Sequence, residues 1–207
     1  MTELSMLALG LGLGLRHAVD PDHLAVITSL LQREREPGQA LRIAALWGAG
    51  HTAAFLAVGL TVVLVGARVP AAFETATDLL VGGMLIGFGA LNLRSSLGSD
   101  ARTGHAHPRR SGAGGPLAIG TVHGLAGSAG VALLATTTIG ARSTAVAYLA
   151  LFGMGTVFGM MALTALLSRP LGWTVRRGRS WGRRVGVTAA TLSVGLGIRF
   201  VVKAVFR

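Results

Sequence analysis

The sequence predicts an all-α, polytopic membrane protein with about six transmembrane helices. Apolar residues make up 51% of the 207 residues and charged residues only 13%, whereas soluble domains usually contain about a quarter charged residues. The mean hydropathy is +0.62. The apolar residues also gather in segments that are each long enough to cross roughly 30 Å of hydrocarbon as a helix. We therefore expect a single transmembrane domain over residues 1–207.

The expected helices follow one another with short connections. They span about residues 4–31, 41–65, 78–97, 116–139, 144–167 and 185–206. The first is interrupted by the polar stretch RHAVDPDHLAVI at residues 16–27. Residues 98–115 are rich in Ser, Gly, Arg and His, which is typical of a loop. This loop divides the chain into two halves of three helices.

Basic residues are distributed unequally among the connections, and this predicts the orientation in the membrane. Those after the first, third and fifth helices hold Arg33, Arg35, Arg42, Arg94, Arg102, Arg109, Arg110, Arg169, Arg176, Arg177, Arg179, Arg183 and Arg184. Cytoplasmic loops carry the excess of Lys and Arg, so these odd-numbered loops are expected in the cytoplasm and both termini outside. We therefore attribute the net charge of +11 to basic residues that set the orientation and contact anionic lipid. We expect no nucleic-acid partner.

A helix break is predicted within the first segment, at Asp20-Pro21. Proline lacks a backbone N–H and disfavours helical geometry at the preceding residue. Asp20 can cap a new helix that has Pro21 at its first position. We expect two half-helices, with carbonyl groups at the end of the first half free to face a cation, as in transporters with broken helices. Arg16 and Asp20, four residues apart, are expected to neutralise each other.

Imidazole and carboxylate groups around this break form a candidate metal site. An ionisable group near the bilayer centre costs at least ~2.5–3.5 kcal/mol on insertion scales, and His17, Asp22 and His23 have no evident partner in their own segment. Such groups are suitable ligands for Ni²⁺ and Co²⁺, and the chain has no cysteine to supply thiolates. The alternative is a buried polar network that only fixes packing.

Two further histidines lie inside apolar segments, each near glycine. They are His51 in WGAGHTAAF and His123 in TVHGLAGSAG. Each could complete the ligand shell of a metal ion or relay protons. The alternative is a core histidine whose hydrogen bonds are satisfied by its surroundings. Together with the polar residues of the first segment, the two histidines favour the metal site. Asn92 is interpreted as an interhelical hydrogen-bonding residue. His105 and His107 are interpreted as part of a solvated loop, and the alternative is that they capture or hand over metal.

A weak internal repeat relates the two halves. With an offset of 106 residues, Leu11, Gly14 and His17 match Leu117, Gly120 and His123. Three helices per half would give the two copies opposite orientations, and inverted repeats of this kind are common in secondary transporters. The two halves would then rock around a bound ion. The alternative is coincidence in a chain rich in Gly and Leu, whose glycines permit close packing of helices in lipid.

The stretch RHAVDPDHLAVI resembles the signature of the nickel/cobalt transporter family of secondary permeases, in which a His is separated by four residues from an Asp-His pair. Here these positions are His17, Asp22 and His23. The Gly-His-Thr sequence at 50–52 is similar to another element of that family. The fourth segment, VHGLAGSAG, is similar to a short, urease-associated branch of nickel-permease-like proteins. The family's further acidic motifs are absent, and Pro21 replaces the usual small residue between the aspartates.

The resemblance implies a multi-pass permease of the cell inner membrane that moves Ni²⁺ and/or Co²⁺ as its substrate and needs no cofactor. It implies His17, Asp22 and His23 as ligands, supported by Asp20 and His51. The expected partners are the divalent metal ion and the lipid bilayer. A homo-oligomer or a metallochaperone partner is left open.

A metal-ion permease is the predicted function, and several alternatives use the same ligands. These are an intramembrane metal-binding subunit, a sensor, and an exporter of another ion. An intramembrane metal-dependent enzyme would also need a general base. The sequence contains no separate motif for a base or a nucleophile, so we expect no enzymatic activity.

Overall fold

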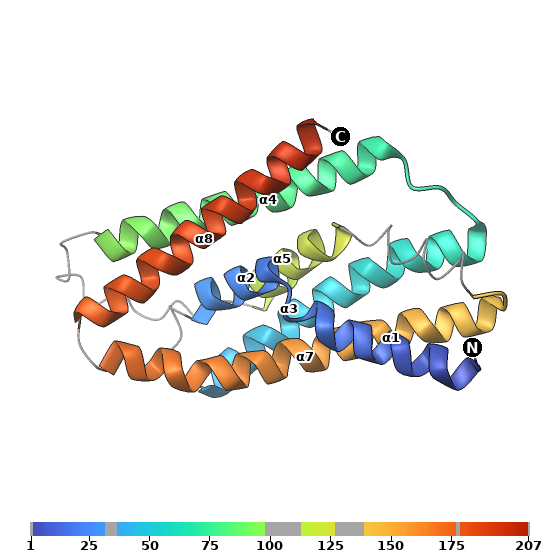
Figure 1. The fold of residues 1–207 in the computed structure, drawn as a ribbon, viewed down its shortest axis with the longest axis horizontal. Coiled ribbons are helices and arrows are strands. Elements are labelled where there is room, and N and C mark those ends of the chain that lie inside the picture. Colours follow the sequence, from blue (N-terminus) through green and yellow to red (C-terminus); the bar gives the residue numbers. More distant parts are fainter. Residues whose placement is uncertain (1, 32–36, 98–112, 127–138, 177–178, 207) are drawn as a thin grey trace.

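The computed structural model describes residues 2–31, 37–97, 113–126, 139–176 and 179–206, and within these ranges the chain is helical apart from short connections. The elements are α1 (Glu3–His17), α2 (Pro21–Leu31), α3 (Pro37–Leu60), the π-helix η1 (Thr61–Val65), α4 (Ala71–Leu97), α5 (Gly114–Leu125), α7 (Arg142–Arg176) and α8 (Arg179–Val205). Figure 1 shows the helices running along one long axis; α1 starts at the right-hand end, and α8 runs from the left-hand end toward that side.

Among the described residues, four helical stretches are long and apolar enough to cross a membrane. They are Gly38–Val65, Ala71–Leu97, Arg142–Ser168 and Ser180–Val205, and they correspond to the second, third, fifth and sixth expected segments. The first segment is divided between α1 and α2. The fourth, expected over 116–139, is described as α5 and Ala126, and residues 127–138 lie outside the described ranges. The structure thus provides four continuous candidates where about six were expected.

Several expected helix boundaries are wrong because the helices continue past their apolar segments. The helix α4 begins at Ala71 instead of residue 78, α7 ends at Arg176 instead of 167, and α8 begins at Arg179 instead of 185. Hydropathy marks the stretch that matches the hydrocarbon thickness, whereas helical hydrogen bonding continues through polar residues at the interface. In the first turns of α8 the Arg184 guanidinium lies 5.9 Å from the centre of the Trp181 ring, an arrangement suited to a membrane interface.

The predicted helix break is confirmed, and it lies at residues 18–20. The backbone N–H of Asp20 donates to the carbonyl of His17 at 3.0 Å, and Pro21 begins α2. The expected pairing of Arg16 with Asp20 is wrong. The Asp20 carboxylate instead lies 2.7 Å from His17 Nδ1, while Arg16 is exposed. Because α1 ends at His17, the turn brings side chains three residues apart together.

Helices pair in a reciprocal pattern across the two halves of the sequence. Helix α1 packs along α7 and α5 packs along α3, while α3 also contacts α7. A Cβ added to Gly155 of α7 would meet the Leu11 carbonyl, and one added to Gly50 of α3 would meet the Leu117 carbonyl. Leu11 and Leu117 are matched positions of the internal repeat, so the matched helices make equivalent contacts.

Helices α4 and α8 form a further pair that lies side by side in Figure 1. Ser193 Oγ of α8 donates to the Leu85 carbonyl of α4 at 2.8 Å. Lys203 Nζ lies 2.9 Å from the buried Asp78 carboxylate. The short helix α2 lies against this pair and contacts α3 and α7 as well, so four helices surround it. Its Val26 is fully buried, as is Trp47 of α3.

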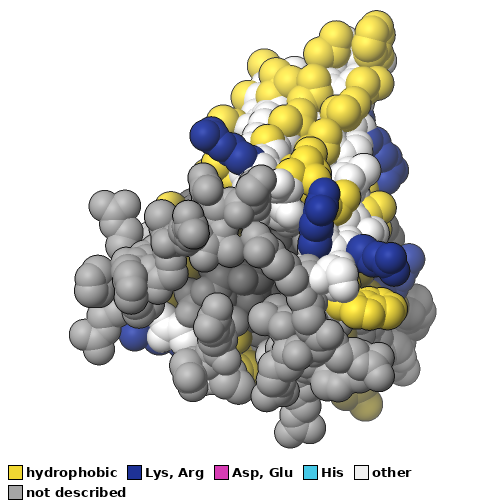
Figure 2. All heavy atoms as spheres, turned by 90° about the vertical axis from the view of Figure 1, so that its left-hand side faces the viewer, with side chains coloured by type: hydrophobic (Ala, Val, Ile, Leu, Met, Phe, Trp, Pro, Cys, Tyr) yellow, Lys and Arg dark blue, Asp and Glu magenta, His cyan; other side chains and the backbone are white. Residues whose placement is uncertain are grey.

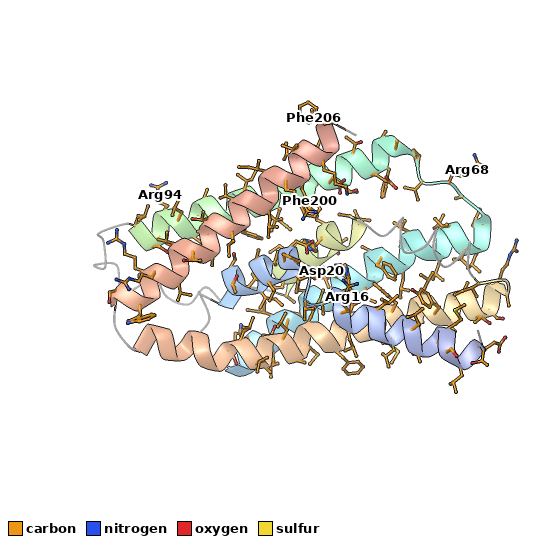
Figure 3. The ribbon with its side chains drawn as sticks, in the orientation of Figure 1. Arg16, Asp20, Arg68, Arg94, Phe200 and Phe206 are labelled. Carbon is orange, nitrogen blue, oxygen red and sulfur yellow. The ribbon has the colours of Figure 1, made fainter. Side chains whose placement is uncertain are left out.

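Basic side chains gather at the end of the molecule where α4 ends and α8 begins. Figure 2 views this end, and its coloured side chains are hydrophobic, basic or polar, with no Asp or Glu visible. Figure 3 places Arg94 at this end and Arg68 at the opposite one. The described basic residues Arg94, Arg183 and Arg184 lie at this end, and its assignment to the cytoplasm stays a prediction.

Gly14→Ala is expected to lower the free energy of unfolding by about 1–3 kcal/mol, the usual range for overpacking. Its Cβ would collide with the Phe152 backbone carbonyl, which can move only if α7 moves. Gly12→Ala is the matched control in the same helix, since its Cβ would meet nothing within 4 Å. Thermal melting in detergent measures both variants. Equal melting temperatures would contradict a tight α1–α7 contact.

Candidate metal centre

Four histidines and two aspartates meet at the break between α1 and α2. His17 ends α1, Asp20 lies in the break, and Asp22 and His23 belong to the first turn of α2. Helix α3 contributes His51, and α5 contributes His123. The structure therefore brings together every residue that the sequence analysis named as a candidate ligand. Figure 3 shows Asp20 at this junction, beside Arg16. Metal binding by the group stays a prediction.

His23 occupies the middle of the cluster. Its ring centroid lies 4.5 Å from that of His17, 5.0 Å from that of His51 and 4.7 Å from that of His123. The rings meet edge to face in all three pairs, and His23 is fully buried. Four imidazoles from three segments of the chain therefore share one small volume.

The potential ligands fall into two overlapping sets that share His23. One set is His17, His23 and His51, and the other is Asp22, His23 and His123; within each set the ligand atoms all lie within 4.8 Å of one another. Atoms bound to one ion at about 2.1 Å lie at most about 4.2 Å apart. A small inward movement would therefore let either set coordinate a divalent ion.

Each carboxylate holds particular histidine rings in place. One oxygen of Asp22 accepts the backbone N–H of His23 at 3.0 Å, and the other lies 3.2 Å from His123 Nε2. The Asp20 carboxylate lies 2.7 Å from His17 Nδ1. Carboxylates that orient imidazoles in this way are common around metal ligands. Asp22 thereby links α2 to α5, and Asp20 fixes the ring at the end of α1.

Several nitrogens of the cluster are buried without a hydrogen bond to any described residue. They are both ring nitrogens of His51, Nε2 of His23 and Nδ1 of His123. An unsatisfied buried polar group costs about 1–3 kcal/mol, so this arrangement is unfavourable in an empty site. A cation that accepts one lone pair from each ring would offset part of that cost. The orphaned nitrogens therefore fit a metal-binding role better than a packing role.

Close backbone contacts between α5 and α3 place His123 beside the other candidate ligands. A Cβ added to Gly120 would collide with the Trp47 carbonyl, and one added to Gly124 would collide with the His51 carbonyl. Glycine at these positions lets α5 lie directly on α3. The turn of α5 that carries His123 is therefore held against the turn of α3 that carries His51.

Aromatic rings that the sequence analysis missed enclose the cluster. The Trp47 ring lies 5.4 Å from His23 and 5.9 Å from His123, and the Phe152 ring lies 5.4 Å from His17. Trp47 could have been found from sequence, because it precedes His51 by one helical turn. Nothing local marked Phe152, which comes from α7. Asn92 is buried in α4, and the loop residues His105 and His107 lie outside the described ranges.

Comparison with known proteins identifies relatives along nearly the whole chain. It is 31% identical over 209 residues to the urease accessory protein UreH of Bacillus sp. (strain TB-90), covering 96% of this chain and 91% of that protein. It is 25% identical over 203 residues to the chloroplast protein FOR GROWTH AND FERTILITY 1 of Arabidopsis thaliana, covering 90% of this chain. The chain spans 55% of that second relative's length. No family model and no solved structure matches.

His51→Leu is expected to raise the melting temperature of the metal-free protein. Leucine has a similar volume and removes two buried nitrogens that lack partners, which relieves a penalty of about 1–3 kcal/mol per group. Thermal melting in detergent with a chelator measures the change. Tyr148→Phe, which removes a buried hydroxyl that also lacks a partner, is the control outside the cluster. A lower melting temperature for His51→Leu alone would show that the His51 ring stabilises the empty fold.

Proposed function

This chain belongs to the family of the urease accessory protein UreH, and we propose that it is a secondary transporter that moves Ni²⁺ and/or Co²⁺ across the cell inner membrane. The observation that carries the proposal is the histidine and aspartate cluster at a helix break, enclosed by helices apolar enough to span a membrane. Ionisable groups are expensive at that depth, and where they occur they commonly mark ion pathways.

The ligand set supports a borderline divalent metal as the substrate. Imidazole with carboxylate suits Ni²⁺ and Co²⁺, whereas Mg²⁺ and Ca²⁺ prefer sites made of oxygen alone. The motif of His17, Asp22 and His23 resembles that of the nickel/cobalt transporters, and a relative that serves urease agrees with the urease-associated branch of that resemblance. Nickel is therefore the first ion to test.

The family's described role is that of an accessory protein and not that of an enzyme. The ligands of the cluster accordingly serve binding and passage of the ion. Both ligand sets share His23, so an ion can move from one set to the other without losing all protein ligands at once. Exchange between neighbouring weak positions permits release, which a single tight cage would prevent.

We propose six crossings of the membrane, two of them interrupted. Helices α1 and α2 together make the first, and the expected segment 116–139, which begins in α5, makes the fourth. In Figure 1, α1 starts at the right-hand end of the molecule and α8 runs from the left-hand end toward that side, as an even number of crossings requires. The end where α8 begins bears Arg94, Arg183 and Arg184, which supports a cytoplasmic position for that end.

Asp22→Asn is expected to reduce Ni²⁺ uptake at least tenfold in proteoliposomes that contain a metal-sensitive dye. The amide cannot supply the negative charge that now contacts both His23 and His123. Glu3→Gln is the matched control, because it makes the same chemical change at an exposed position at the start of α1. Uptake at the wild-type rate by Asp22→Asn would contradict the proposal.

The same assay separates the other functions. Saturable Ni²⁺ binding by the purified protein without flux would identify a metal-binding subunit or a sensor. Flux of an anion that is indifferent to chelators would identify a transporter of another ion. Either result would overturn the assignment of metal transport.

A further inference from the structure

A cavity of about 350 Å³ borders the metal cluster without being part of it. Its walls are formed by Asp20, Pro21, Asp22, Leu196, Arg199, Phe200 and Lys203. The first three belong to the helix break, and the other four belong to α8. Asp22 lines this cavity and is also a member of one ligand set, so the cavity ends directly at a candidate ligand. Figure 3 shows Asp20 and Phe200 on the elements that face each other here.

The cavity is large enough for a hydrated ion. Six waters occupy about 180 Å³ at their share of liquid volume, roughly 30 Å³ each. A divalent ion with its full hydration shell therefore fits, and further waters fit beside it. The cluster itself is too crowded for such a shell, since its ring centroids lie 4.5–5.9 Å apart. An ion would have to lose water between the two places.

The wall on α8 is a stripe of two basic and two apolar side chains on one helix face. Leu196, Arg199, Phe200 and Lys203 follow the spacing of three and four residues that keeps side chains on one side of a helix. Ile198 and Val202, on other faces, are 51% and 48% exposed, as expected for side chains that contact lipid. Charged side chains in a membrane-spanning helix normally face a water-filled cavity or one another.

The two cations of this wall are not equivalent. Lys203 is held 2.9 Å from the buried Asp78 carboxylate of α4, so its charge is compensated. Arg199 forms no ion pair with any described residue, and its side chain is exposed. Across the cavity, Asp20 contacts His17 and Asp22 contacts His23 and His123. An ion in the cavity would thus have carboxylates ahead of it and one uncompensated guanidinium beside it.

We propose that this cavity is the entrance vestibule through which the hydrated ion reaches Asp22, with the face of α8 from Leu196 to Lys203 as its outer wall. The inference rests on the proposed function for the identity of the ion. The ion passes Arg199, exchanges water first for Asp22, His23 and His123, and then reaches His17 and His51 through the shared His23. The stripe lies near the end of α8, so the vestibule serves the side of the membrane where both termini lie.

The absence of cysteine from the chain allows a direct test. Leu196→Cys and Ile198→Cys each introduce one thiol, on the cavity face and on the lipid face of the same helix. A membrane-impermeant trimethylammonium methanethiosulfonate reagent, added to cells from outside, is expected to modify Leu196→Cys at least tenfold faster than Ile198→Cys. Added Ni²⁺ should slow that reaction. Modification should reduce Ni²⁺ uptake at least fivefold in Leu196→Cys and leave uptake by Ile198→Cys unchanged.

Equal labelling rates, or rapid labelling with unchanged uptake, would overturn the vestibule. A wild-type melting temperature of Leu196→Cys in detergent verifies its fold. If the wild-type chain transports no Ni²⁺, the proposed function fails. The labelling rates still test whether the cavity is an entrance. Rapid reaction of Leu196→Cys that Ni²⁺ slows then supports an entrance to a binding site, and slow reaction overturns it.

Arg199→Gln gives an independent electrostatic readout. Removing a positive charge beside the path raises the local concentration of a cation, so the KM for Ni²⁺ should fall about threefold or more at low ionic strength while kcat stays unchanged. Arg142→Gln, at the start of α7 and away from the cavity, is the control. An unchanged or raised KM for Arg199→Gln would show that the ion does not pass this side chain.

Discussion

The end of helical hydrogen bonding at His17 is the constraint on which the site depends. In an unbroken helix, residues 17, 20, 22 and 23 would project at steps of about 100°, and no common point could face them all. The turn at residues 18–20 places Asp20 against His17 and lets the rings of His17 and His23 approach to 4.5 Å. It also creates α2, a half-helix short enough to be enclosed by its neighbours. The ligand cluster is therefore a consequence of one local backbone event.

That cluster is unfavourable by itself, and the packing around it offsets the penalty. Apolar helices gain little from mutual burial in lipid, so their association depends on close van der Waals contact. Gly14 against Phe152, and Gly120 and Gly124 against α3, provide such contact on both sides of the histidines. In α1, Gly14 comes three residues before the candidate ligand His17. In α5, Gly120 and Gly124 lie on either side of the candidate ligand His123. The same short sequences thus bring helices together and present imidazole between them, which is why the internal repeat matches both a glycine and a histidine.

The sequence predicted what depends on local chemistry and failed where distant segments decide. Asp20-Pro21 predicted the break because proline acts on its own backbone. The six residues of the cluster could be named because polar residues are conspicuous in apolar segments, and metal binding by them stays a prediction. The expected pairing of Asp20 with Arg16 was wrong, because it assumed that the helix continues through residues 18–20. Helix ends were misplaced because hydropathy marks only the stretch that matches the hydrocarbon thickness, and the helices continue beyond it. The role of Arg199 and Lys203 was missed altogether. Near the C-terminus they resemble ordinary interfacial charges, and only the position of α8 against the break places them on a cavity wall.

The packing also revises how the molecule could move. Two rigid halves divided at residues 98–115 do not fit the contacts, because α1 packs on α7 and α5 packs on α3. The tightly joined units are instead the α1–α7 pair and the α3–α5 pair, which the internal repeat relates to each other. His17 belongs to the first unit, His51 and His123 belong to the second, and His23 lies between them on α2. A tilt of one pair against the other would change the distances from His17 to His51 and leave His51 and His123 together. Such a motion would weaken the set of His17, His23 and His51, whereas the set of Asp22, His23 and His123 would keep its geometry if α2 moved together with α3 and α5. The two ligand sets would then differ in affinity at each stage of transport.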